Sequence, residues 1–228
     1  MYSLDIIVPF YNEENFLQKS VERLLEINIH SSITLIDNNS TDSSVDIALN
    51  LAKKDNVKYV KTNIKQGKGV ALRFSAEYLS GTHVVIHDAD LEYFAEDLIE
   101  LKKLSIKYPT SLILGSRFIG SKLRKIRYSK AYYANKFLSK LFSIVYGYPI
   151  SDVATCYKLL PVDVFKNLNL TEDGFAIEIE ILAKYLKLSD ANIIEVPIKY
   201  EGRSYQEGKK IKFLDGINYL IKILTYRF

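Results

Sequence analysis

The chain is poor in cysteine: Cys156 is the only one among 228 residues, so no disulfide can form within the chain. This favours a reducing compartment. No apolar run approaches the roughly 18 residues that a membrane-spanning helix needs. The N-terminus also lacks a basic segment followed by an apolar stretch and a cleavage site, so we expect no signal peptide. The expectation is a cytoplasmic protein that meets a membrane only at its surface.

A strong excess of charge of one sign is also missing. The formal net charge is +4 at pH 7, whereas nucleic-acid-binding domains carry a stronger and more localised basic excess. We therefore expect no nucleic acid partner. An anionic substrate or an anionic membrane surface fits the mild basic balance. With 48% hydrophobic and 25% charged residues, the chain has enough apolar material for a full core and is not typical of disordered proteins.

The first 120 residues alternate short apolar runs with segments of helical periodicity. The runs are rich in β-branched residues, and the helical segments are about 10–15 residues long, a pattern typical of βαβ units. We expect an α/β fold with a mostly parallel central sheet flanked by helices. The predicted strands are 4–10, 33–37, 57–62, 82–88 and 111–118, and the predicted helices are 13–27, 43–54, 69–79 and 95–108.

The pattern changes after Gly120. Residues 121–147 are basic and aromatic and are predicted to be helical. Further on, we expect strands at 156–160 and 192–200, a helix beginning at Pro161, and helices at 175–186 and 211–226. We interpret residues 1–228 as one unit, in which 1–120 bind a nucleotide and 121–228 bind the acceptor.

The glycine motifs of common nucleotide sites are absent. The first strand is followed by PFYNEEN, which has no glycine, so a site for NAD or FAD is disfavoured. The P-loop pattern is also missing, because QGKGV at residues 66–70 has the wrong spacing and no Ser or Thr after the lysine.

Acidic residues stand where predicted strands end. In open parallel sheets, ligands bind outside the carboxyl ends of the strands. Asp37 ends the second strand, where it can accept hydrogen bonds from a base or ribose or close an Asx turn. Asp88 and Asp90 follow the fourth strand. Carboxylates at this position can hold Mg²⁺ or Mn²⁺, which would bridge the phosphates of a nucleoside diphosphate.

Seven segments together resemble the family 2 glycosyltransferases, and within them the synthases of dolichyl- or polyprenyl-phosphate mannose and glucose. They occur in the family's order and cover almost the whole chain. The segments are IIVPFYNEE (6–14), IDNNSTDSS (36–44), QGKGVALR (66–73), HDADLEY (87–93), LGSRF (114–118), SDVATCYKLL (151–160) and EVPIKYEGRSYQEGKKIKFLDG (195–216).

The resemblance implies a GT-A type, Rossmann-like fold and an inverting transfer of a hexose from a nucleotide sugar. Glu92 departs from the glutamine of some relatives, yet a carboxylate is a competent ligand for a hard cation. The implied roles are base and ribose binding for Pro9, Tyr11, Glu13 and Asp37, a place near the nucleotide for Lys68, contact with the sugar diphosphate for Asp88, Ala89 and Asp90, metal binding for Asp90 with Glu92, and phosphate binding for Arg117, Arg203 and Lys209.

The acceptor stays open between two chemistries. A polyprenyl or dolichyl phosphate is largely ionised at neutral pH and needs no general base, so Asp88, Asp90 and Arg117 would carry the reaction. A sugar hydroxyl needs a base. TEDG at residues 171–174 resembles a motif of processive family 2 synthases, which makes Asp173 the candidate, with Asp152 and Glu178 behind it. We favour a packed or capping role for Glu178.

Two further classes of protein fit the sequence less well. A sugar nucleotidyltransferase would normally show a glycine-rich basic loop after the first strand, and a non-catalytic nucleotide-sugar-binding subunit would not need Asp88, Asp90 and Arg117. The donor, GDP-mannose or UDP-glucose, stays open. Residues 121–147 can lie in a membrane interface. Because no membrane anchor precedes Phe228, a membrane-anchoring partner protein is conceivable.

Overall fold

A seven-stranded sheet forms the centre of the protein, in the order β3-β2-β1-β4-β7-β5-β8. The computed structural model describes residues 1–62, 67–120, 124–125, 129–203 and 213–227. The strands of this sheet are β1 (Leu4–Phe10), β2 (Ser32–Asp37), β3 (Val57–Lys61), β4 (His83–Ile86), β5 (Leu112–Ser116), β7 (Lys158–Pro161) and β8 (Ile193–Pro197).

Most neighbouring strands run parallel. β1 pairs in parallel with both β2 and β4, and β5 with β8. The exception is β7, which lies antiparallel between β4 and β5. Ile6, Ile7 and Val8 of β1 are all fully buried, as expected for a central strand covered on both faces. The predicted α/β fold with a mostly parallel sheet is confirmed.

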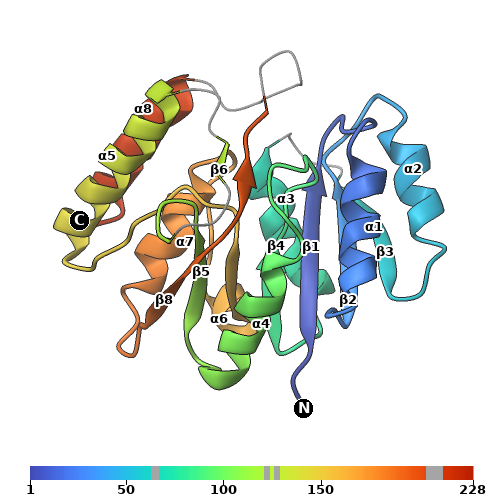
Figure 1. The fold of residues 1–228 in the computed structure, drawn as a ribbon, viewed down its shortest axis with the longest axis horizontal. Helices are drawn as coiled ribbons and strands as arrows, with labels where there is room; N and C mark the ends of the chain where they lie inside the picture. The colour runs from blue at the N-terminus through green and yellow to red at the C-terminus, as the bar shows by residue number, and fades with distance from the viewer. Residues whose placement is uncertain (63–66, 121–123, 126–128, 204–212, 228) are drawn as a thin grey trace.

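Helices pack on both sides of this sheet (Figure 1). α5 and α8 lie side by side, away from the strands β1 to β3 (Figure 1). In the described residues, no helix is both long and apolar enough to cross a membrane. The helices are α1 (Leu17–Ile27), α2 (Ser44–Leu51), α3 (Lys68–Ser75), the 3₁₀ helix η1 (Ala76–Tyr78), α4 (Asp97–Lys107), α5 (Ser129–Tyr146), α6 (Val162–Asn167), α7 (Ile177–Tyr185) and α8 (Phe213–Thr225).

The strand predicted at 192–200 is divided in two. β8 ends at Pro197, and β9 (Tyr200–Glu201) pairs in parallel with β6 (Arg124–Lys125) in a separate small sheet. The reason lies at Lys199, whose backbone N–H donates to the Asp97 carboxylate at 2.6 Å instead of to a neighbouring strand. The side chain of Asp97 thus ends the backbone pairing of β8, and the chain turns toward the candidate active site.

Candidate active site

A cavity of about 270 Å³ lies at the carboxyl ends of β1 and β4. Its volume is close to the lower end of ligand-binding pockets, which begin at about 300 Å³. Its position matches the rule for ligand sites in open parallel sheets. The lining residues are Pro9, Phe10, Tyr11, Glu13, Asn38, Gly67, Lys68, Asp88, Ala89, Asp90, Glu92, Tyr93, Arg117, Ala154, Phe175, Glu178, Tyr200, Arg203 and Tyr219.

The turn after β1 brings Tyr11 and Glu13 to the cavity wall. Asn12 adopts a left-handed backbone conformation with φ of 48°, which asparagine tolerates better than most residues. The backbone N–H of Glu13 donates to the Ser44 hydroxyl at 2.8 Å. The N-terminus of α2 thereby fixes the turn. Polar residues of the segment 36–44 can therefore support the site even where they do not line the cavity.

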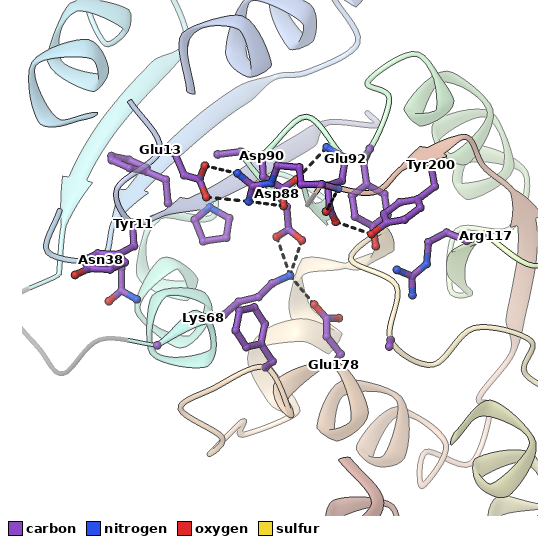
Figure 2. A pocket seen from close by; sticks show the side chains of 18 of the residues that line it. Tyr11, Glu13, Asn38, Lys68, Asp88, Asp90, Glu92, Arg117, Glu178 and Tyr200 are labelled. Atoms are coloured by element: carbon purple, nitrogen blue, oxygen red, sulfur yellow. Dashed lines mark hydrogen bonds and ion pairs between the residues drawn. The ribbon is translucent and has the colours of Figure 1, made fainter. Parts of the chain in front are cut away.

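The turn after β4 carries the two aspartates. Leu91, between Asp90 and Glu92, has φ of 61°, a conformation that leucine rarely adopts and that costs on the order of 1 kcal/mol. The backbone N–H of Glu92 donates to the Asp90 carboxylate at 3.1 Å. This strained turn points Asp88 and Asp90 into one cavity (Figure 2).

Two glycines allow Lys68 to reach the same cavity. A Cβ atom on Gly67 would collide with the carbonyl oxygen of Asp173, and one on Gly69 with that of Glu172. Gly67 also has φ of 157°, at the limit of the region that favours glycine. The glycines of QGKG therefore allow the start of α3 to pack against the turn at residues 172–173, rather than to cradle a phosphate.

The Lys68 ammonium lies between two carboxylates, as Figure 2 shows. Its Nζ atom is 2.7 Å from Asp88 Oδ1 and 2.7 Å from Glu178 Oε1. Glu178 in turn contacts the buried ammonium of Lys158 at 2.5 Å. Glu178 comes from α7 and Lys158 from β7, so this ionic cluster joins the two halves of the chain.

A second cluster centres on Arg203. Its guanidinium contacts Glu13 at 2.9 Å and Asp90 at 3.1 Å. Its backbone N–H donates to Glu92 at 2.6 Å, and the other Glu92 oxygen accepts from the Tyr200 hydroxyl at 2.6 Å. The end of β9 is thereby tied to the turns after β1 and β4, which closes one side of the cavity.

Arg117, directly after β5, is held from beneath by Asp152. The contact is bidentate, with 2.7 Å from Nε to Oδ2 and 2.8 Å from Nη2 to Oδ1. Asp152 is fully buried, and the guanidinium lies 5.0 Å from the Tyr200 ring centroid. Although burial opposes the charge, the Asp152 carboxylate raises the pKa of Arg117. The result is a permanently charged, rigidly oriented cation at the cavity wall.

The two aspartates of the turn have different electrostatics. Burial raises the pKa of Asp88, but the Lys68 ammonium outweighs it, and the net shift is downward. At Asp90, burial and the like charge of Glu92 raise the pKa to about 7, and Arg203 offsets this only in part. Asp88 is thus neutralised by a partner of its own, whereas Asp90 lies in a local excess of negative charge.

The donor set around Asp90 fits a divalent cation that also binds a substrate. Among the described residues, no group of three or more His, Cys, Asp or Glu side chains is arranged to hold a metal. Mg²⁺, however, is usually held by one or two carboxylates together with waters and substrate phosphates. Asp90 and Glu92 supply two carboxylates, and each carboxylate oxygen can accept more than one contact.

Most of the residues expected from the sequence line this cavity, but Asp37, Asp173 and the further candidate base Asp152 do not. Asp37 is fully buried and accepts from the Ser40 backbone at 2.7 Å and from the Tyr59 hydroxyl at 3.0 Å, and Asn38 lines the cavity beside it. Asp173 pairs with Arg73 at 2.8 Å instead. Lys209, the remaining expected residue, and its neighbour Lys210 lie outside the described residues.

Sequence reasoning missed the place of Glu178 and the aromatic wall. Glu178 was expected to pack or cap, yet it lines the cavity and pairs with two lysines. A signal existed, because IEIEI puts Glu178 and Glu180 among apolar residues of a helix that is buried nearly all round. A buried acid requires a cation. For Tyr200 and Tyr219, no spacing in the sequence indicated a position in the site.

Comparison with known proteins gives the family. A model described as glycosyl transferase family 2 matches residues 5–168. The chain belongs to this family.

Three curated relatives are similar over most of this chain. The low-salt glycan biosynthesis hexosyltransferase Agl6 of Haloferax volcanii is 25% identical, over 94% of this chain and 51% of its own length. Glycosyltransferase AglJ of the same organism is 26% identical, over 87% and 63%. The dolichyl-phosphate beta-glucosyltransferase ALG5A of Trichomonas vaginalis is 25% identical, over 97% and 71%. The chain thus spans about half to two thirds of the length of the first two.

Solved structures show the fold type. A glucosyl-3-phosphoglycerate synthase from Mycobacterium tuberculosis, crystallised with Mn²⁺, uridine diphosphate and glucosyl-3-phosphoglycerate, aligns with a TM-score of 0.74 at 15% identity, over 99% of this chain and 80% of that one. Its complex with Mn²⁺, uridine diphosphate and phosphoglyceric acid aligns with a TM-score of 0.76 at 15% identity, over 99% and 78%. The fold is therefore of the GT-A type.

Proposed function

We propose that the protein is an inverting hexosyltransferase that moves a hexose from a nucleotide sugar, GDP-mannose or UDP-glucose, to a polyprenyl or dolichyl phosphate. One observation carries the proposal: a single cavity combines the carboxylates of the turns after β1 and β4 with the guanidinium groups of Arg117 and Arg203. In this proposal residues 1–120 bind the donor and residues 121–228 the acceptor, within one catalytic unit.

The donor half presents hydrogen-bond acceptors and apolar surface to the nucleotide. Pro9, Tyr11 and Asn38 border the cavity beside β1 and would flank the base and ribose, while the buried Asp37 carboxylate accepts from Ser40 and Tyr59 next to them. Asp88 and Ala89 would meet the sugar diphosphate. A divalent cation held by Asp90 and Glu92 would neutralise the departing diphosphate.

Two anions must approach one another in this reaction, the donor diphosphate and the acceptor phosphate. Arg117 and Arg203 are fixed cations that would bind phosphate oxygens and reduce this repulsion. An ionised phosphate oxygen would attack the anomeric carbon from the side opposite the diphosphate in a single step, with inversion. No proton needs to be removed, because the acceptor is already largely ionised at neutral pH.

The arrangement of the acidic residues supports a phosphate acceptor over a hydroxyl. A general base must come within hydrogen-bond reach of the attacking group. The Asp173 side chain pairs with Arg73 and does not line the cavity, and Asp152 lies buried under Arg117. Glu178 lines it, but its two oxygens already contact the ammonium groups of Lys68 and Lys158. The dolichyl-phosphate specificity in the name of one relative supports the same choice.

The helix pair α5 and α8 would face the membrane that carries the acceptor, at its cytoplasmic side. Apolar side chains are exposed on both helices, and Lys136 and Lys140 of α5 are exposed near them. Basic, apolar helix surfaces bind the interface of anionic membranes. A membrane-anchoring partner protein could strengthen this contact. The exposed apolar residues are Tyr133, Phe137, Ile144, Leu214, Ile217, Ile221 and Leu224.

The decisive experiment is transfer to a lipid phosphate. The protein is incubated with labelled GDP-mannose or UDP-glucose, Mg²⁺ or Mn²⁺, and either polyprenyl phosphate or the free polyprenol. We expect a labelled lipid product only from the phosphate, and inverted stereochemistry at the anomeric carbon. Transfer to the alcohol, or to a glycan with loss of activity in Asp173→Asn, would favour the hydroxyl mechanism instead. Nucleotide sugar formed from a sugar 1-phosphate and a nucleoside triphosphate would make the protein a nucleotidyltransferase.

A further inference from the structure

Four ionic side chains form a chain of alternating sign that runs from the core to the cavity. It begins at Lys158, whose side chain is 0% exposed, passes through Glu178 at 2% and Lys68 at 9%, and ends at Asp88 at 24%. Exposure rises at every step, so the chain has a direction, and its last three members line the cavity (Figure 2).

Lys68 contacts carboxylates on two sides within this chain. An ammonium group has three N–H donors. The Lys68 Nζ contacts both oxygens of Asp88, at 2.7 and 3.0 Å, and Glu178 at 2.7 Å. Lys68 therefore orients the two oxygens of Asp88, which in turn borders the cavity.

Fold stability alone does not account for such a chain. Burying ionic groups carries a large desolvation penalty, and apolar side chains of similar volume are often equally or more stabilising. Lys158 and Glu178 belong to β7 and α7 of the acceptor half, whereas Lys68 and Asp88 belong to the donor half. The cluster thus fixes the position of Asp88 from the opposite half of the chain.

We propose that Glu178 and Lys158 are positioning residues of the transfer site: Lys158 orients Glu178, Glu178 holds Lys68, and Lys68 fixes the Asp88 carboxylate against the bound nucleotide sugar. This inference rests on the proposed function. It assigns to the second half of the chain a role in donor binding, in addition to acceptor binding.

Three variants test it in a thermodynamic cycle. Lys68→Met removes the contact with Asp88. Glu178→Gln/Lys158→Met removes the supporting pair without leaving a buried charge unpaired, which should preserve the fold. The triple variant combines both. For each, kcat and KM for the nucleotide sugar are measured separately with polyprenyl phosphate as acceptor, beside the melting temperature.

We expect both the single and the double variant to raise KM about tenfold. The triple variant should raise KM by the same factor of about ten, because the effects of substitutions that act through one contact do not add. A merely structural role gives another pattern. Loss of folded protein lowers kcat in proportion and leaves KM unchanged. A triple variant with a KM raised about a hundredfold, or a double variant with the KM of the wild type, would overturn the proposal.

Two further variants complete the test. Asp5→Asn is the matched control: Asp5 is a buried carboxylate at the start of β1, where it accepts from Ser32 and Ser80, so this variant should lower the melting temperature and leave KM unchanged. Glu178→Asp keeps the charge beside Lys158 but shortens the reach to Lys68. It should raise KM even where the double variant fails to fold, and a wild-type KM would count against the proposal. A wild-type protein that transfers no sugar to polyprenyl phosphate would instead refute the proposed function.

Discussion

The segments that follow the strands supply opposite charges to the cavity in the two parts of the sheet, while Lys68 of α3 and Glu178 of α7 form an ion pair between the parts. In the part made of β3, β2, β1 and β4, the turns after β1 and β4 contribute the carboxylates of Glu13, Asp88, Asp90 and Glu92. In the part made of β7, β5 and β8, the chain beyond β5 and beyond β8 contributes the guanidinium groups of Arg117 and Arg203. A transfer between two anions needs both kinds of group, and the fold delivers them from different sides.

The parts also differ in how their charges are balanced. Arg117 is neutralised by Asp152, which comes from its own half of the sheet. Among the carboxylates of the first part, Asp88 pairs with Lys68 of the same part, but Glu13 and Asp90 depend on Arg203, which is remote in sequence. Since Asp90 still has a raised pKa of about 7, the carboxylate side is the one with unbalanced charge. We therefore expect the largest functional effects there.

Removal of divalent metal should have the largest effect. Treatment with EDTA is expected to lower the rate of nucleoside diphosphate release on the order of a thousandfold, because the leaving diphosphate loses its main neutralising charge. Addition of Mn²⁺ or Mg²⁺ should restore the rate, while Ca²⁺, which prefers longer bonds and more ligands, should restore less. Full activity in EDTA would mean that Arg117 and Arg203 suffice to neutralise the leaving diphosphate. The carboxylate side of the cavity would then contribute no more than the guanidinium side.

Asp90→Asn should follow with a loss of activity of roughly a hundredfold or more. The amide retains an acceptor for Arg203 but cannot match a carboxylate as a ligand for a hard cation. The melting temperature without metal should stay near that of the wild type, whereas the stabilisation that Mn²⁺ with UDP or GDP gives the wild type should be lost. A variant that keeps this metal-dependent stabilisation would move the metal away from Asp90.

The first part of the sheet was largely predictable from the sequence, and the reason is physical. There, strands and helices follow one another as βα units, so the carboxyl ends of successive parallel strands meet at one edge of the sheet. This placed Asp88 and Asp90 in one site, and with them Asp37, which does not line the cavity, whereas Tyr11 was assigned from the family resemblance. The second part was not predictable in the same way, because β7 inserts antiparallel between β4 and β5. The contact of Glu178 with Lys68 depends on that insertion.

Pairings across the sheet were the other unpredictable feature. Arg203 and Glu13 are 190 residues apart in sequence, and nothing local indicates that they meet. The sequence did identify Arg203 and Arg117 as functional cations by family resemblance, but not that each lies in a preformed ion pair. Such pairs are a property of tertiary packing, which periodicity and turn signals do not encode.

Arg117→Lys tests the guanidinium side and should cost less, about thirtyfold in kcat/KM. Lysine keeps the positive charge but cannot bind Asp152 in bidentate fashion or stack on Tyr200, so the cation loses its fixed orientation. Chemical denaturation should show a parallel loss of stability, because Asp152 remains buried without its full set of contacts. A fall in kcat/KM as large as that of Asp90→Asn would show that the carboxylate and guanidinium sides of the cavity contribute equally to the reaction.

The smallest effect is expected for Asp173→Asn, which lies on neither side of the cavity. Its carboxylate pairs with Arg73, and the two side chains are 45% and 30% exposed. Such partly exposed pairs contribute at most about 1 kcal/mol, and surface changes of this kind are usually within about 0.5 kcal/mol, or roughly twofold. The transfer rate to polyprenyl phosphate should therefore stay within about twofold of the wild type. Abolished transfer in Asp173→Asn would identify Asp173 as a general base, and the acceptor would then be a hydroxyl that must lose its proton.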